Sequence, residues 1–334
     1  MRLLRAHTFV GEIEPGRLQV GSAPPRTVVF SSLSRAETAW IKSLSPTITS
    51  GQPQPRANVA RNRKGSQQGR PRGSASENSL TARQKEMLVM LDAVGLLEDG
   101  HNPLADLRIR VSGLDRIGAR VATLLAEEGV RELELRDRRA IEQVMPPAFT
   151  ESHLGKIRQT VLARHLRGRY PGLRVAGQAM PDLVVVCSGS VWDHGTLGRL
   201  LSRDIPHLPV VQRDREVQVG PLIVPGVTGC ALCADLSIQD SFPLWAKSSL
   251  ALANAPQPLT PDHLCMTAAG LAVTLIYAAA TGATPVGAPN PTGVGGVSYS
   301  LTVGSNGVET RAWHPHPGCS CRRGTMDTGV AQVA

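Results

Sequence analysis

The sequence predicts an α/β fold in which a Rossmann-like, nucleotide-binding domain with a mostly parallel sheet follows a small winged-helix-like module. Two observations carry this prediction. After residue 104, a short strand, a glycine turn, a helix and a second strand ending in an acid follow one another, which is the order of a nucleotide-binding fold. Before them, strand-like segments and two helix caps indicate a separate small unit. A length of 334 residues suits two domains.

The first unit is expected to consist of short strands followed by two helices. Gly16–Gly21 and Arg26–Phe30 have the composition of strands, and two prolines form the turn between them. Ser34 and Thr81 each have a Glu or Gln three residues later, which is the spacing of a capping box that begins a helix. The second helix carries mixed charges, so we expect a peptide- or protein-docking module rather than a DNA-binding one. The module consists of two pieces, residues 1–45 and residues 79–100.

The basic segment between these pieces, residues 46–78, is predicted to be a disordered linker. From Ser45 to Ala82 the chain is rich in Pro, Gly, Ser and Gln, lacks apolar periodicity, and has six basic residues against one acid. More than half of the chain's net charge of +9 therefore lies here. The segment is either a solubilising linker or an arm that contacts an acidic partner. No aromatic residue alternates with the arginines, so nucleic acid is not an expected partner.

A candidate phosphate-binding turn follows the predicted strand Arg108–Val111. Gly113 and Gly118 have the spacing of the first and last glycines of G-x-G-x-x-G, a turn whose backbone amides face a phosphate. Asp137, at the end of the next strand, is the candidate ligand of ribose hydroxyls. The middle glycine position holds Asp115, whose carboxylate would repel a phosphate. The pattern therefore predicts the fold but argues against a phosphate at this turn.

Apolar segments downstream are expected to complete the sheet and its covering helices. Leu183–Cys187 is a continuous apolar run, as in a parallel strand buried on both faces. The turn sequence Gly304–Gly307 predicts a late hairpin. An alanine-rich helix is expected at Asp262–Ala280, facing the core or a second copy of the chain. Further strands are predicted at His207–Val211, Val219–Val224, Val297–Val303 and Val308–Trp313.

Four cysteines in two close pairs form a candidate metal site. Cys230 and Cys233 make a C-x-x-C pair, and Cys319 and Cys321 make a C-x-C pair after an interval of 85 residues. Four thiolates suit a closed tetrahedral zinc that joins two distant segments of a chain. The alternatives are a redox-active C-x-x-C pair or unrelated buried thiols. We expect the structural zinc site.

Composition excludes several other classes of protein. No run approaches 18 consecutive apolar residues, so no transmembrane helix is expected, and the first residues lack the apolar core of a signal peptide. Six cysteines are too few for a disulfide scaffold in a chain of this length. We therefore expect a soluble, cytoplasmic protein that does not bind membranes.

The C-terminal two thirds of the chain resemble the ThiF/MoeB superfamily of ubiquitin-activating-type adenylyltransferases. The resemblance rests on the turn Val111–Gly118, on Asp137, on Gly155 with Arg158, and on the late cysteine pairs; its most specific part is Val219–Cys233. With the N-terminal module, the chain resembles a bacterial subgroup in which a winged-helix leader-recognition element precedes a ThiF-like domain. Proteins of this subgroup are associated with bacteriocin (TOMM) biosynthesis, where they bind a precursor's leader and deliver the precursor to a YcaO-type cyclodehydratase that makes thiazole or oxazole rings.

The resemblance implies an ATP site. Active members of the family cradle ATP on the glycine turn, matched here by Gly113 and Gly118. They hold the ribose with an acid matched by Asp137, and contact phosphate with a basic residue matched by Arg158. The family's magnesium-binding acid is missing, because Cys187–His194 stands where it should be. Adenylation needs metal and positive charge on the leaving pyrophosphate, so we expect a catalytically degenerate fold.

The resemblance therefore predicts a partner protein that binds a leader peptide and presents it to a YcaO-type enzyme. It implies a structural zinc, leaves ATP as an implied ligand, and permits a homodimer through the helix 262–280. The alternatives are an active ATP-dependent adenylyltransferase acting on a peptide or protein carboxylate, a nicotinamide-dependent oxidoreductase, and a DNA-binding regulator. The remaining expected segments are a ThiF-like domain with the zinc site at residues 104–323 and a disordered tail at residues 324–334.

Overall fold

Two compact units make up the chain, residues 1–101 and residues 102–334, and each is described by itself. The predicted linker at 46–78 and the predicted tail at 324–334 lie outside the described residues. The computed structural model describes residues 3–5, 8–45, 80–98, 102–145, 148–175, 177, 179–256, 258–282 and 296–321.

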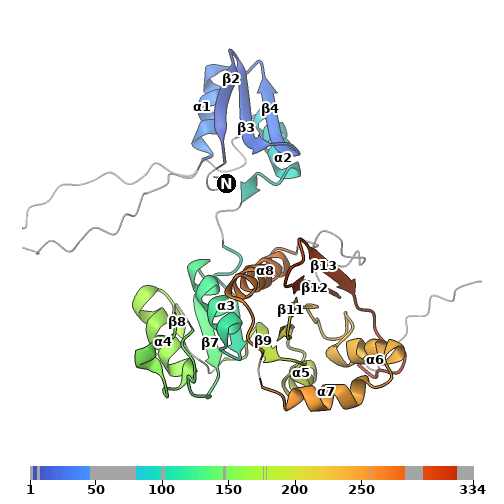
Figure 1. Ribbon diagram of the computed structural model, residues 1–334. Coiled ribbons are helices and arrows are strands. Elements are labelled where there is room, and N and C mark those ends of the chain that lie inside the picture. Colours follow the sequence, from blue (N-terminus) through green and yellow to red (C-terminus); the bar gives the residue numbers. More distant parts are fainter. Residues whose placement is uncertain are drawn as a thin grey trace, which may run out of the picture. The chain divides into compact units, whose positions relative to one another are not determined.

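The N-terminal unit is a three-stranded antiparallel sheet packed against two helices (Figure 1). The strand order is β2-β3-β4, so β2 and β4 are the edges of the sheet. The core consists of Leu18 and Val20 from the sheet with Ile41 and Leu91 from the helices. Its elements are β1 (Leu3–Leu4), β2 (Val10–Glu14), β3 (Arg17–Ala23), β4 (Arg26–Ser31), α1 (Arg35–Ser43), α2 (Ala82–Ala93) and β5 (Leu97–Glu98), which pairs with β1.

Both predicted helix starts in this unit are confirmed. The Ser34 hydroxyl accepts a hydrogen bond from the Glu37 N–H at 3.2 Å, and the Glu37 carboxylate accepts the Ser34 N–H at 2.8 Å. Thr81 and Gln84 form the same pair of bonds, at 3.2 and 2.9 Å. The first strand of the sheet, β2, was not predicted. Most of its side chains are exposed, so its sequence lacks the alternation of a half-buried strand.

The C-terminal unit contains an eight-stranded mixed sheet with the order β13-β12-β11-β10-β9-β6-β7-β8. The strands from β8 to β10 pair in parallel, and β10 to β13 pair antiparallel. This arrangement confirms the predicted mostly parallel, Rossmann-like sheet. The strands are β6 (Arg108–Ser112), β7 (Glu132–Arg136), β8 (Arg174–Val175), β9 (Leu183–Gly189), β10 (His207–Gln212), β11 (Glu216–Val219), β12 (Val297–Thr302) and β13 (Val308–Ala312).

Helices cover both faces of this sheet. The central strand β9 is apolar on both sides: Val185 packs with the cluster beneath α3, α4 and α8, and Val186 packs with the cluster beneath α5 and α6. The helical elements are α3 (Arg116–Glu127), the 3₁₀ turn Glu151–His153, α4 (Arg158–Arg169), α5 (His194–Leu201), α6 (Ala231–Ser241), α7 (Trp245–Ala253) and α8 (Asp262–Ala280).

One expected strand, Val219–Val224, differs in the structure. The strand β11 instead ends at Val219, because Gly220 adopts a φ of +85° and redirects the chain, after which Ile223 forms a single bridge with His207. The expected helix at Asp262–Ala280 is confirmed. By length and composition α8 is also apolar enough to cross a membrane, but it packs on α3 and on the sheet through residues such as Ala268 and Ile276.

The topology places a crevice at the carboxyl ends of the parallel strands. From β6 the chain moves to β7 on one side and later to β9 on the other, so the strand order reverses beside β6. Open α/β sheets bind their ligands at such a switch point. The loops that follow β6, β7 and β9 contain Gly113, Asp137 and Asp193, so they determine what the crevice can bind.

Candidate functional site

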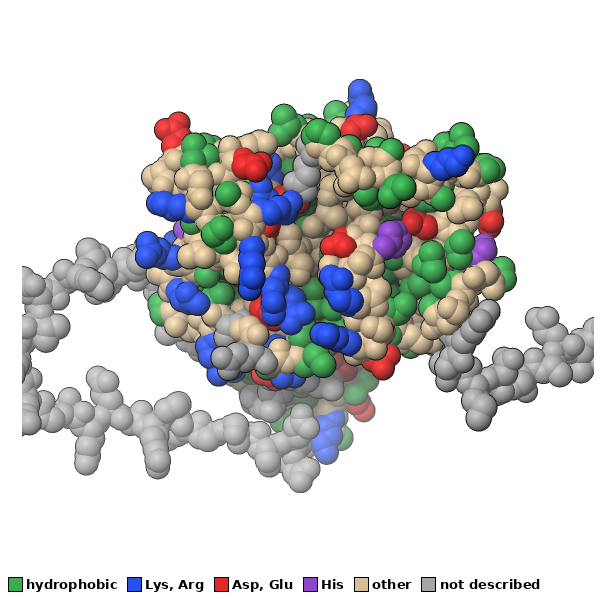
Figure 2. Space-filling model, turned by 90° about the horizontal axis from the view of Figure 1, so that it is seen from below, with side chains coloured by type: hydrophobic (Ala, Val, Ile, Leu, Met, Phe, Trp, Pro, Cys, Tyr) green, Lys and Arg blue, Asp and Glu red, His purple; other side chains and the backbone are tan. Residues whose placement is uncertain are grey.

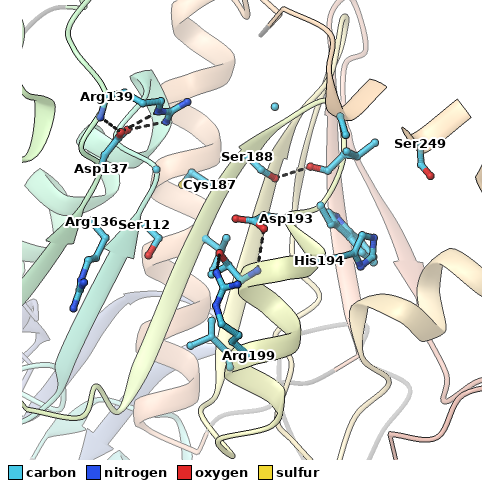
Figure 3. Close-up of a pocket in the computed structure, with 18 of the residues that line it drawn as sticks. Ser112, Arg136, Asp137, Arg139, Cys187, Ser188, Asp193, His194, Arg199 and Ser249 are labelled. Atoms are coloured by element: carbon cyan, nitrogen blue, oxygen red, sulfur yellow. Dashed lines mark hydrogen bonds and ion pairs between the residues drawn. The ribbon is translucent and has the colours of Figure 1, made fainter. Parts of the chain in front are cut away.

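A cavity of about 1220 Å³ opens at this switch point. The ends of β6, β7 and β9 form its floor, and residues of α5 and α7 line it from the sides. Figure 3 shows Asp137 and Arg139 on the β7 side and Asp193 and Arg199 on the α5 side. A large concave site at the carboxyl ends of parallel strands is the expected place for a ligand, so this cavity is the candidate site.

The predicted glycine turn forms one part of the site. Gly113 has a φ of +82°, and a Cβ there would lie 2.1 Å from the carbonyl oxygen of Cys187. A Cβ on Gly118 would lie 1.9 Å from the carbonyl oxygen of Gly113. Both positions therefore require glycine for the close approach of β6, β9 and α3. The turn retains the backbone shape of a nucleotide-binding fold.

Asp115 occupies the N-terminus of α3, where a ligand phosphate would be expected. Its Oδ1 accepts hydrogen bonds from the N–H groups of Ile117 and Gly118, both at 2.9 Å. Its Oδ2 is buried without a hydrogen-bond partner among the described residues. Burial raises the pKa of the Asp115 carboxyl group, although the two amide bonds oppose this shift. The protein's own carboxyl group thus occupies the amides that would bind an anion at this helix end.

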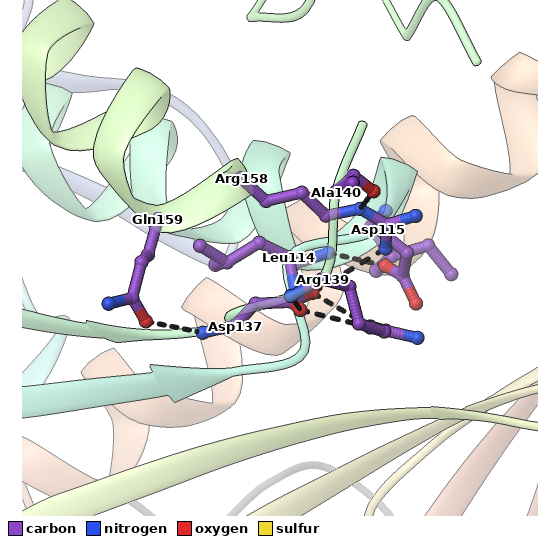
Figure 4. A network of polar contacts seen from close by, with 9 residues as sticks. Leu114, Asp115, Asp137, Arg139, Ala140, Arg158 and Gln159 are labelled. Atoms are coloured by element: carbon purple, nitrogen blue, oxygen red, sulfur yellow. Dashed lines mark hydrogen bonds and ion pairs between the residues drawn. The ribbon is translucent and has the colours of Figure 1, made fainter. Parts of the chain in front are cut away.

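The carboxylate of Asp137 is engaged in the same turn (Figure 4). It accepts a hydrogen bond from the Leu114 N–H at 2.8 Å. It also accepts hydrogen bonds from Nε and Nη2 of Arg139, at 2.9 and 2.7 Å. Its side chain is only 2% exposed. Burial alone raises the pKa of Asp137, but the bonds from Arg139 and Leu114 outweigh it, so the pKa lies below the usual value. The carboxylate holds the glycine turn and has little capacity left for ribose hydroxyls.

Arg158, the fourth residue predicted at the nucleotide site, joins this network from α4. It is buried, its Nε donates to the Ala140 carbonyl at 3.2 Å, and its Nη1 lies 3.5 Å from Oδ2 of Asp137. The structure therefore brings the predicted residues together around one turn. Gly113 and Asp137 line the cavity, whereas Gly118 and Arg158 do not.

The side of the cavity formed by α5 was not foreseen from the sequence. Asp193 caps α5 with its side chain, and His194 Nε2 lies 2.6 Å from Asp235 Oδ2, a contact that raises the pKa of His194. Arg199 and Arg203 also line the cavity. Arg199 lies in α5 and Arg203 lies in the turn after it; only the capping aspartate at the start of the helix was a signal readable from the sequence.

The four predicted metal ligands lie together, apart from the cavity. Cys230 Sγ is 3.8 Å from Cys233 Sγ and 3.7 Å from Cys319 Sγ, and Cys233 Sγ is 3.4 Å from Cys321 Sγ. All four sulfurs lie within 4.8 Å of one another. A tetrahedral zinc with Zn–S bonds of about 2.3 Å requires sulfurs about 3.8 Å apart. The donor set and its spacing therefore fit such an ion, which would join the start of α6 to the segment after β13.

No family model and no curated protein matches the chain, but solved structures of E. coli MccB do. The structure with a succinimide has a TM-score of 0.61 at 15% identity and covers 97% of this chain and 99% of that one. The structure with ATP gives 0.60 at 16% identity, covering 96% and 99%. The microcin C7 biosynthetic enzyme MccB in complex with N-formylated MccA gives 0.61 at 15% identity, covering 96% and 99%. At this identity the likeness concerns the fold, and it confirms the predicted ThiF-type architecture.

The role of Asp137 in holding the turn predicts a pH-dependent loss of stability in Asp137→Asn. At pH 7 the variant should lose about 1.5–3 kcal/mol of unfolding free energy, because the turn N–H and two arginines lose their charged acceptor. The folded pKa lies below the unfolded value of 3.8, so this contribution is present above pH 3.8 and is lost as the pH falls through the folded pKa. The deficit should therefore stay constant from pH 7 to 5 and shrink below 4.

Urea unfolding at each pH measures this difference. The matched control is Asp214→Asn, because Asp214 is exposed and lies outside the network; its effect should stay within about 0.5 kcal/mol. An Asp137→Asn deficit no larger than that of the control would show that this carboxylate does not hold the turn.

Proposed function

We propose that the chain is a ThiF-like partner protein that binds a ribosomally made precursor peptide through its leader, without adenylating it. It then presents the peptide to a YcaO-type cyclodehydratase. The observation that carries the proposal is the Asp115 carboxyl group, which takes the amides of Ile117 and Gly118 at the head of α3. Nucleotide-binding folds use these amides to bind phosphate. Their occupation by Asp115 therefore argues against adenylation, although the nucleotide-binding fold itself is present.

The surroundings of the turn support a binding role over a catalytic one. Asp137, the candidate ribose ligand, is committed to Leu114 and Arg139. The first carboxylate after β9 is Asp193, and it is used to cap α5. No described acid at the end of β9 is therefore free to hold the magnesium ion that phosphoryl chemistry requires. Gly113, Gly118 and Arg158 were expected to contact ATP. In the structure, they contact other residues of the protein.

Peptide binding is the role that we assign to the N-terminal unit. The edge strand β4 presents Val29, which is 43% exposed. The N-terminus of α2 lies beside the end of β4, because Arg83 Nη2 donates to the Ser32 carbonyl at 3.0 Å. Farther along α2, Val89 and Met90 are exposed apolar side chains. An extended leader peptide can add to such an edge by main-chain bonds and place apolar side chains against the neighbouring helix. The MccB structures that contain MccA support a peptide ligand for this fold.

An active adenylyltransferase is the second candidate. It is favoured by the likeness, over 96% of this chain, to MccB crystallised with ATP. This candidate requires ATP to displace Asp115 from the head of α3, whereas the first candidate requires no movement of the turn. The YcaO-type partner and the homodimer stay predictions under both candidates.

Capture of the precursor encoded beside the gene tests the proposed function. We expect a fluorescein-labelled synthetic leader to bind the full chain in an anisotropy titration. Val29→Asp should weaken binding at least tenfold, about 1.4 kcal/mol, because it places a charge on the exposed face of the edge strand to which the peptide adds. The matched control is Ile13→Asp, on the opposite edge strand β2, where the exposed fraction is 47%. It should change affinity less than about twofold. Absence of leader binding, or equal losses in both variants, would contradict the proposal.

We also propose that the four cysteines hold one structural zinc ion. The purified chain should contain about one zinc per polypeptide by elemental analysis, and Cys233→Ser should lose it, because zinc prefers a closed set of four thiolates. Cys265→Ser is the matched control, since this buried thiol lies in α8 and outside the cluster. A zinc content well below one in the unaltered chain, or equal loss in the control, would refute the assignment.

A further inference from the structure

Two cations on the α5 side of the cavity have no acidic partner within the described part of the chain. Arg199 Nη2 donates to the Thr196 hydroxyl at 3.0 Å, and no carboxylate among the described residues lies within ion-pair distance of Arg199 or Arg203. Both residues line the cavity. They differ in this from Arg139, on the β7 side, which is paired with Asp137. Two unpaired guanidinium groups in one cleft favour an anionic ligand.

The cavity lining as a whole contains five arginines and two acids, Asp137 and Asp193, so the positive charges outnumber the negative ones. Arg110 and Arg136 share the single carboxylate of Glu134, so this group of three carries a net positive charge. The Arg136 side chain is 53% exposed and lines the cavity. In the space-filling view, Lys and Arg side chains gather along a hollow on the face seen from below (Figure 2). A cleft lined by one sign of charge concentrates ligands of the opposite sign.

The lining on the α7 side is mostly apolar, with Ser249 as its polar member. The helix α7 has no buried residue among Trp245–Ala253, and it contributes Ala246, Leu250 and Ala253 to the cavity. Leu250 is 70% exposed, so its side chain is accessible to an apolar group of a ligand. Trp192, which is only 4% exposed, also lines the cavity. The ligand therefore has to combine acidic groups with apolar ones.

The size of the cavity and the state of the glycine turn narrow the class of ligand. At about 1220 Å³ the cavity exceeds the range of about 300–1,000 Å³ that is typical of small-molecule pockets. Asp115 takes the helix amides that would hold a nucleotide phosphate. The unpaired cations lie instead on α5 and in the turn after it, where they can meet carboxylates spaced along an extended chain.

We propose that this cavity binds an acidic, partly apolar segment of a peptide, with its carboxylates on Arg199 and Arg203 and its apolar side chains against Leu250 and Trp192. The inference rests on the proposed function, because it gives the precursor a second contact besides the leader-binding edge of the N-terminal unit. Leader capture then involves the first contact, and recognition of an acidic segment involves the second. The two contacts are separable by mutation because they lie in different units of the chain.

Two synthetic octapeptide probes test the proposal on the full chain. One alternates Glu and Leu, the other alternates Gln and Leu, and both carry fluorescein. We expect the acidic probe to bind and the Gln probe to bind at least tenfold more weakly. The double variant R199A/R203A should weaken the acidic probe at least tenfold. The matched control R131A/R164A removes the same charge from exposed positions that do not line the cavity, and should change affinity less than twofold.

Equal binding of the two probes, or equal losses in the two double variants, would overturn the proposal. Displacement of the acidic probe by micromolar ATP would overturn it too, because the cavity would then be a nucleotide site. The outcome is distinguishable from that of the proposed function: Val29→Asp should leave binding of the acidic probe unchanged. Leader capture that is intact, together with an acidic probe unaffected by R199A/R203A, would refute the second contact alone.

Discussion

The hydrogen bonds from Ile117 and Gly118 to the Asp115 carboxyl group determine what the C-terminal unit can do. They satisfy the head of α3 from within the chain, so the helix does not need a ligand to complete it. The Asp137 carboxylate accepts the Leu114 N–H and also binds Arg139. The acids and amides that would contact a nucleotide are therefore bonded to one another within the glycine turn. The glycines that shape the turn are still required, because β6, β9 and α3 approach one another closely there.

Under the proposed function, the turn is a structural element and the binding surfaces of the chain lie elsewhere. The N-terminal unit offers the edge of β4 beside exposed apolar residues of α2. The cavity of the C-terminal unit combines unpaired arginines after β9 with the apolar side of α7. We propose that both surfaces bind extended peptide. The likeness to MccB, at about 15% identity, concerns the fold.

Local patterns predicted much of this arrangement. The capping boxes at Ser34 and Thr81 were readable because their hydrogen bonds connect residues three apart. The glycine turn was readable from the spacing of Gly113 and Gly118, and the cysteine pairs were readable because each is a short motif. The two pairs do meet in space, whereas the identity of a bound metal is still a prediction. The α5 and α7 sides of the cavity were not predictable, because the fold alone brings Arg199 and Leu250, far apart in the sequence, to one cavity. The end of β11 was missed because Gly220 redirects an otherwise strand-like run.

Isothermal titration of the full, unaltered chain with ATP and magnesium is the most direct test of the central claim that Asp115 closes the nucleotide site. We predict no saturable binding at nucleotide concentrations up to about 1 mM, because the amides at the head of α3 and the Asp137 carboxylate are already engaged. Stoichiometric binding with a Kd of about 10 μM or below would contradict the account, since it would show that ATP displaces these contacts.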